Sequence, residues 1–196
     1  MTLRLANSLL SATVLLVLTA CSSPSSSYFY QLPAPSQNQL APGVTMDKQA
    51  ADNSHADKSL FIEPVKVASY LSGRGLVLQT SAVELVMARQ HLWAEALDQQ
   101  LQRQLRQHLS QLAPAYAVQL QPGAHSTRLW LQLDSFHGSA DGYALLSGHF
   151  LLSGQPLSQP FSYRVPLTDD GYPALVAALG QGVQQLSQQI AAQLTP

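Results

Sequence analysis

Residues 93–112 read WAEALDQQLQRQLRQHLSQL. Leucine recurs at every fourth position from Leu97 to Leu109, which places one apolar stripe along a helix of 3.6 residues per turn. Glutamine and arginine fill the opposite side, and Pro114 ends the pattern. The stretch therefore predicts an amphipathic helix over residues 93–112 that buries one face against another part of the fold.

A second apolar stripe lies near the C-terminus, where large aliphatic side chains recur at helical spacing from Leu175 to Ile190. The sequence DDG at residues 169–171 is typical of a turn with a helix cap. Gly180 and Gly182 interrupt this second helix, and each costs about 1 kcal/mol relative to alanine. We expect these glycines to let the helix approach a sheet closely.

The segments around the two helices have the alternation or the β-branched content of strands. Pro64 confines the first of them to an edge or a bulge, and the SGQP loop at residues 153–156 favours antiparallel pairing of the last two. The sequence predicts an α+β fold, a two-layer sandwich in which two amphipathic helices pack on a mostly antiparallel sheet. The predicted strands are residues 60–67, 76–80, 83–88, 116–120, 127–136, 143–152 and 159–167.

Residues 1–20 have the pattern of a secretory signal peptide, with Arg4 before an apolar run too short to span a bilayer. LTAC at residues 18–21 is the lipobox pattern, in which the cysteine thiol takes a diacylglyceryl group. We expect lipidation at Cys21, with an incidental cysteine after a cleaved signal as the alternative. Ser22 stands where aspartate usually marks inner-membrane retention, which favours the periplasmic face of the outer membrane.

The rest of the chain divides into a tether and one domain. Residues 21–27 form the lipidated cysteine and tether, and residues 28–196 form a single α+β domain with a flexible excursion at about 33–58, where large apolar groups are few. Residues 28–32 alternate as a short strand. If this strand docks, which is the favoured alternative, the tether spans about 20 Å at full extension. Otherwise the tether is far longer.

Composition limits the range of functions. Charged residues make up 11% of the chain and the formal net charge is −1, which excludes a nucleic-acid footprint and a polybasic membrane patch. The six histidines lack the spacing of a metal site, so neither a metal nor another cofactor is expected. His108 falls within the leucine stripe of the first helix, where a partly buried structural histidine is the favoured interpretation.

Several catalytic residue types come together at residues 134–139, which read DSFHGS. In a strand Asp134 and His137 point to opposite faces, and Ser139 belongs to a turn rather than to a nucleophile elbow. No catalytic residue is predicted, and the chain is not expected to be an enzyme. Candidates for contact with a partner, with core packing as the alternative, are the aromatic residues Tyr70, Trp93 and Trp130.

Three stretches carry a resemblance to a known family. They read YFYQLP at residues 28–33, YLSGRGLVLQT at 70–80 and LWAEALDQQL at 92–101. Together with the lipobox, they resemble the ABC-type transport auxiliary lipoprotein family. Ala68 and Gln79 stand where many members have proline and arginine, which favours one branch of the family and leaves open which transporter the chain serves.

The resemblance implies a component of a Pqi-type intermembrane lipid transport system, without catalytic residues or a cofactor. In such a system the lipidated domain docks a periplasm-spanning, PqiB-like MCE protein at the outer membrane and, through it, a PqiA-like inner-membrane protein. A homo-oligomeric ring is a further arrangement that the resemblance implies. The residues expected to contact the partner are Tyr70, Leu71, Gly73, Gly75 and Trp93.

Two other functions are compatible with the sequence. A periplasmic hydrolase would need Asp134, His137 or Ser139 to converge in a cleft. An envelope-stabilising lipoprotein without a transport partner would need no such site.

Overall fold

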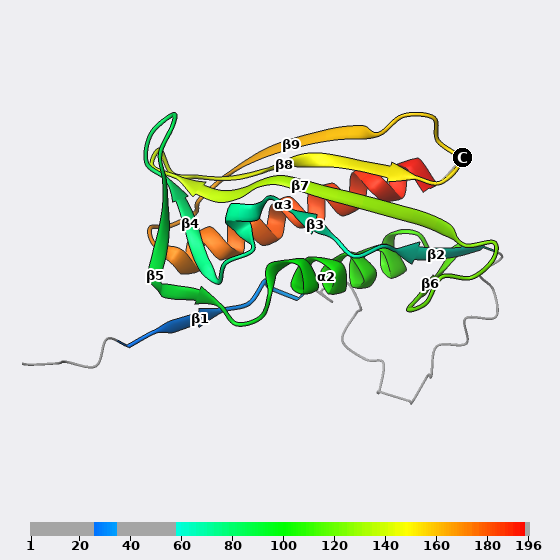
Figure 1. Ribbon diagram of the computed structural model, residues 1–196, viewed down its shortest axis with the longest axis horizontal. Coiled ribbons are helices and arrows are strands. Elements are labelled where there is room, and N and C mark those ends of the chain that lie inside the picture. The colour runs from blue at the N-terminus through cyan, green and yellow to red at the C-terminus, as the bar shows by residue number, and fades with distance from the viewer. Residues whose placement is uncertain (1–25, 35–57, 195–196) are drawn as a thin grey trace, which may run out of the picture.

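The computed structural model describes residues 26–34 and 58–194, which form one sheet and two long helices (Figure 1). The predicted signal peptide, Cys21 and most of the predicted excursion lie outside the described residues. The strands are β1 (Tyr28–Tyr30), β2 (Lys58–Ile62), β3 (Lys66–Val67), β4 (Gly75–Gln79), β5 (Leu85–Trp93), β6 (Tyr116–Gln119), β7 (Thr127–Ser139), β8 (Tyr143–Leu152) and β9 (Gln159–Pro166). The helices are the 3₁₀ turn η2 (Ser69–Leu71), α2 (Leu97–Leu112) and α3 (Tyr172–Leu194).

The long strand β7 organises the sheet. On one edge it pairs antiparallel with β8, and β8 pairs antiparallel with β9 through the predicted hairpin. On the other edge β2, β3 and β4 pair with β7 in succession, all parallel to it. Beyond them β6 pairs parallel with β2, β5 antiparallel with β4, and β1 parallel with β5.

The expectation of a mostly antiparallel sheet is therefore wrong. Among the described strands, the five pairings β1–β5, β2–β6, β2–β7, β3–β7 and β4–β7 are parallel, so the sheet is mixed. The reason is that α2 intervenes between residues 58–79 and β7, and a crossover through a helix returns the chain in the same direction. The sequence-based prediction assumed that neighbouring strands pair through tight turns. It therefore missed the parallel pairing that the crossover through α2 produces.

Both helices cover one face of the sheet, as Figure 1 shows, and they pack on each other. The leucine stripe of α2, from Leu97 to Leu109, is buried in the core that α3 and β7–β9 complete. The α+β class and the two packed helices are confirmed. The predicted helix start at residue 93 is wrong, because the Trp93 amide donates to the Arg74 carbonyl at 2.6 Å and keeps residues 85–93 in β5.

The N-terminal segment docks on the domain as the favoured alternative expected. Leu32 is buried, its amide donates to Oε1 of the buried Gln100 at 3.0 Å, and Gln104 Nε2 donates to its carbonyl at 3.4 Å. A Cβ on Gly180 would lie 2.5 Å from Pro33 of this segment, whereas one on Gly182 would meet Leu146 of β8 at 3.1 Å. One glycine of α3 therefore admits the sheet, as predicted, and the other admits the N-terminal segment.

Candidate interaction surfaces

Three of the predicted partner residues face the interior. Leu71 and Trp93 are each 3% exposed, and the Trp93 ring lies 5.9 Å from that of Phe136. The Tyr70 hydroxyl donates to the Asp134 carbonyl at 2.9 Å, and partial burial raises the pKa of this hydroxyl. Their contact with a partner stays a prediction, while their packing shows that residues 70–80 and 92–101 both contribute to the core.

The two glycines of the same motif differ in their surroundings. Gly73 is exposed, and a Cβ there would meet no atom within 4 Å. Gly75 begins β4, and a Cβ there would lie 2.6 Å from the Ala88 carbonyl oxygen of β5. Gly75 therefore permits the close approach of two strands, whereas Gly73 leaves room at the surface.

Arg74, which sequence reasoning did not single out, ties this motif to the end of β5. Its guanidinium donates to the Trp93 carbonyl at 3.1 and 3.2 Å and to the Ala94 carbonyl at 3.2 Å. It also lies 5.4 Å from the ring centre of Phe29 on β1. The only sequence signal for this role is an arginine between two glycines. Its hydrogen-bond partners lie 19 and 20 residues further along the chain, so local patterns do not reveal them.

The residues that suggested a hydrolase do not converge. The Asp134 carboxylate accepts from Gln132 Nε2 at 3.0 Å and lies 3.3 Å from His149 Nδ1. His137 is buried with its Nδ1 3.0 Å from the Gly138 carbonyl, and the Ser139 hydroxyl bonds to Asp141 in the next turn. The geometry gives no support to the hydrolase alternative.

Neither a metal cluster nor a membrane-spanning helix is found within residues 26–34 and 58–194. No three His, Cys, Asp or Glu side chains of these segments lie close enough together to bind a metal ion. None of their helices combines the length and apolar character needed to cross a bilayer.

His108 has the structural role that its place in the leucine stripe suggested. Its Nδ1 lies 2.9 Å from the hydroxyl of the buried Ser187 on α3, and that hydroxyl in turn donates to the Val183 carbonyl at 2.8 Å. Burial lowers the pKa of the imidazole, which favours its neutral form. This chain of contacts joins the two helices through polar groups in an otherwise apolar contact.

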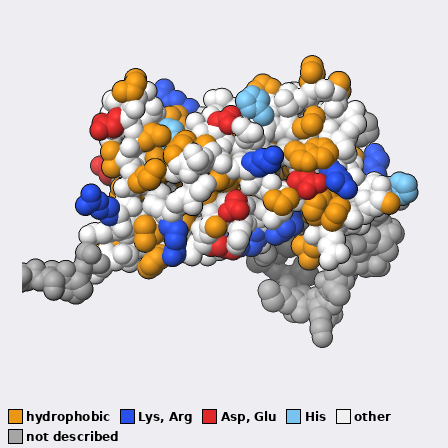
Figure 2. Space-filling view, in the orientation of Figure 1, with side chains coloured by type: hydrophobic (Ala, Val, Ile, Leu, Met, Phe, Trp, Pro, Cys, Tyr) orange, Lys and Arg blue, Asp and Glu red, His pale blue; other side chains and the backbone are white. Residues whose placement is uncertain are grey.

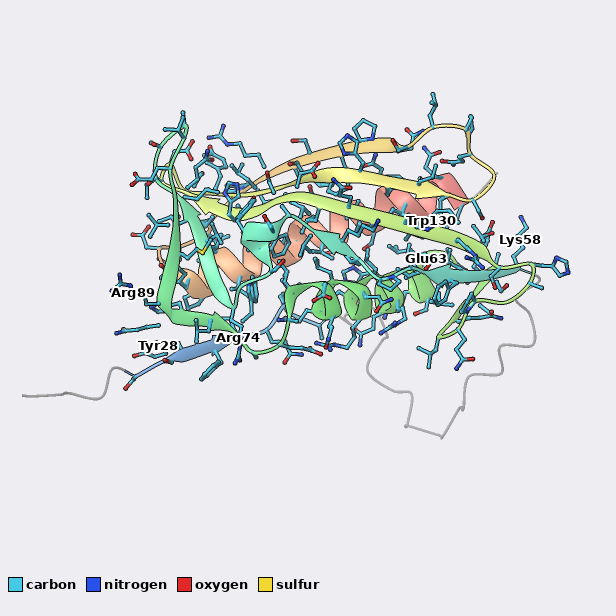
Figure 3. All side chains as sticks on the ribbon, viewed as in Figure 1. Tyr28, Lys58, Glu63, Arg74, Arg89 and Trp130 are labelled. Carbon is cyan, nitrogen blue, oxygen red and sulfur yellow. The ribbon has the colours of Figure 1, made fainter. Side chains whose placement is uncertain are left out.

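The face of the sheet opposite the helices carries a groove around Trp130, which Figure 3 labels. Trp130 is 38% exposed and lies directly across from Leu151, while Gln132 lies across from His149. The groove has a volume of about 310 Å³ and also contacts Lys66. Trp130 is thus the one of the three candidate aromatics that is well placed to contact a partner.

Two further groups of exposed apolar side chains lie at the end of the molecule that carries β1 and the β4–β5 hairpin, one at each end of β5 (Figure 1). The hairpin tip comprises Val83, Leu85, Val86 and Met87, all exposed, and the aromatic pair comprises Tyr28 and Phe29 of β1, also exposed. In Figure 2 hydrophobic side chains are visible at this end, with Lys and Arg as well as Asp or Glu side chains among them. The sequence predicted strands at residues 76–80 and 83–88 but did not indicate that the residues between and after them are exposed.

These features define a mixed α+β sandwich with exposed apolar surfaces and without converging catalytic side chains among its described residues. Residues 38–191 match the family described as the ABC-type transport auxiliary lipoprotein component, and the chain belongs to this family. The family is one of transport components rather than of enzymes.

Individual proteins and solved structures are also similar to this chain. The chain is 36% identical over 154 residues, 77% of its length and 77% of theirs, to the intermembrane transport lipoprotein PqiC of Escherichia coli strain K12 and to that of Shigella flexneri. It is similar to a crystal structure of an uncharacterized protein, with a TM-score of 0.73, 35% identity, and coverage of 87% of this chain and 99% of the other. A crystal structure of a Xanthomonas campestris protein shares the fold, with a TM-score of 0.60 and 15% identity over 85% of this chain and 98% of the other.

Proposed function

We propose that this chain is an intermembrane transport lipoprotein, anchored in the outer membrane through Cys21, that docks the distal end of a PqiB-like MCE protein. Through that protein it would connect to a PqiA-like inner-membrane protein, so that lipid passes between membranes shielded from water. The observation that carries the proposal is the 36% identity with PqiC over 77% of both chains. The lipobox at residues 18–21 supports the anchor.

The Trp130 groove is the docking site that the geometry supports best. Its tryptophan is a large amphipathic side chain beside Leu151, and Lys66 and His149 also line the groove. Tryptophan is enriched among the residues that dominate binding energy at protein interfaces. Of the residues expected from the family resemblance, Gly73 is exposed and Tyr70 half-buried, but neither lines this groove. Gly73 precedes Arg74, which lies far from Trp130 in Figure 3, so a contact through Gly73 would belong to a separate surface.

Co-purification tests this proposal. A tagged, lipidated chain is recovered from a detergent extract of the envelope, and the eluate is examined for an MCE protein. Trp130→Ala should weaken the interaction by about 2 kcal/mol, or roughly thirtyfold in affinity, if the tryptophan anchors the interface. The matched control is Leu120→Ala, which removes an exposed apolar side chain from the loop after β6.

Three outcomes separate the alternatives. Recovery of an MCE protein with the parent chain and with Leu120→Ala, but not with Trp130→Ala, supports docking at the groove. Recovery that is equal with both variants rejects the groove and keeps the function. Recovery of no MCE protein with the parent chain rejects docking and favours an envelope-stabilising lipoprotein.

A further inference from the structure

The hairpin tip exposes more apolar surface than folding alone explains. Val83 is 96% exposed and Met87 is 51% exposed, with Val86 and Leu85 beside them. The one charged side chain among these positions, Glu84, accepts from the Thr80 hydroxyl at 2.7 Å and so stays within the hairpin. Clustered exposed apolar side chains on a protein mark contact with a partner or a membrane.

The aromatic pair adds an amphipathic surface at the same end of the molecule. Tyr28 is 55% and Phe29 58% exposed, and the Arg74 guanidinium lies over the Phe29 ring. Figure 3 shows Tyr28, Arg74 and Arg89 at this end, far from Trp130 and Lys58. Aromatic rings beside guanidinium groups suit the interface of a lipid bilayer, where the rings sit at headgroup level and the cations meet phosphates.

The short distance along the chain from Cys21 to Tyr28 favours a lipid surface over a protein as the partner of these apolar side chains. Tyr28 follows Cys21 by seven residues, which can span at most about 25 Å at full extension. The start of β1 is held on the domain by parallel pairing of Tyr28 with His91. Acyl chains attached at Cys21 would therefore hold the aromatic pair close to the membrane.

We propose that the hairpin tip and the aromatic pair form a lipid-contacting surface that enters the headgroup region of the anchoring membrane. This inference rests on the proposed anchor at Cys21. Apolar tip residues enter the boundary of the acyl region, and Arg74 and Arg89 lie at the level of the lipid phosphates. The domain is then held in one orientation, with the Trp130 groove about 30 Å away along β7.

Lipid quenching of a site-specific fluorophore tests this orientation. Val83→Cys is introduced into the full chain, where the thiol of Cys21 would be blocked by its own lipid, and is labelled with an environment-sensitive dye. The matched control is Leu157→Cys, which is also exposed and lies in the β8–β9 loop at the opposite end (Figure 1). The lipidated proteins are reconstituted into vesicles of phosphatidylethanolamine and phosphatidylglycerol, with or without brominated phosphatidylcholine.

We expect quenching of about twofold for the label at position 83, and none at position 157, because interfacial apolar groups sit about 5–10 Å deep at the headgroup–acyl boundary. A label at Met87→Cys should be quenched as well. Vesicle-bound protein without quenching at positions 83 and 87 overturns the inference while leaving the anchor intact. A blue shift without quenching, which indicates contact with another protein, overturns it too. Protein that does not remain with the vesicles contradicts the anchor itself, and the inference falls with it.

Discussion

Gly75 and Gly73 stand two positions apart in one motif, yet only Gly75 is sterically constrained. A Cβ at Gly75 would lie 2.6 Å from the backbone oxygen of Ala88, whereas one at Gly73 would meet nothing within 4 Å. Gly75→Ala should therefore cost about 1–3 kcal/mol of unfolding free energy by overpacking, and Gly73→Ala should change it by less than about 1 kcal/mol. Urea unfolding of both variants checks this difference. Equal stability would contradict the strand contact.

His108 should make folding stability depend on pH in a defined direction. Burial lowers the pKa of its imidazole below the ordinary 6.5, so the unfolded chain binds the proton more readily. Stability is then unaffected by this group well above pH 6.5 and falls as the pH drops below it. Relative to His108→Gln, the parent chain should lose stability between about pH 7 and pH 5. Parallel urea titrations at the two pH values measure this, and identical losses would contradict the argument.

The sequence indicated some of these residues and could not indicate others. His108 was recognised because it interrupts a leucine stripe, which is a local pattern. Arg74 and Gln100 act through partners 19 and 68 residues away, at Trp93 and Leu32. Polar residues of this kind look like ordinary surface positions until the fold brings their partners together.

At the scale of elements, the short N-terminal segment is held by hydrogen bonds as well as by packing. Gln100 of α2 accepts from the Leu32 amide at 3.0 Å and donates to the Glu95 carbonyl at 2.9 Å. Gln100→Met keeps the volume and removes both bonds, which should cost about 1–3 kcal/mol because a buried amide loses its partner. Gln99→Met, at an exposed position of the same helix, is the control.

Hydrogen exchange of the backbone amides tests this prediction separately for each element. We expect the Leu32 amide to exchange faster in Gln100→Met than in Gln99→Met, with β7 and β8 protected in both. Unchanged protection of Leu32 in Gln100→Met would show that the segment is held by packing alone.

Local patterns predicted most of the elements, and long-range pairings account for the errors. The β8–β9 hairpin and the two helices follow from turn residues and periodicity. The parallel pairings of β2, β3 and β4 with β7 join segments separated by α2, and no local signal encodes them. The start of α2 was misplaced for the same reason, since the pairing of Trp93 with Arg74 is also non-local.

The whole molecule presents two different surfaces at separate places. The hairpin tip and the aromatic pair lie at the end where the chain arrives from Cys21, and the Trp130 groove lies on the open face of the sheet. A domain oriented in this way can rest on a membrane while its groove remains open to a periplasmic partner. Both this orientation and the proposed docking role depend on acyl chains at residue 21.

Intact-mass spectrometry of the protein extracted from the outer-membrane fraction of its host tests that dependence most directly. The predicted result is a chain that begins at Cys21 and carries the added mass of a diacylglyceryl group on the thiol. A chain without acyl groups, recovered from the soluble periplasmic fraction, would contradict both the anchor and the docking role that depends on it.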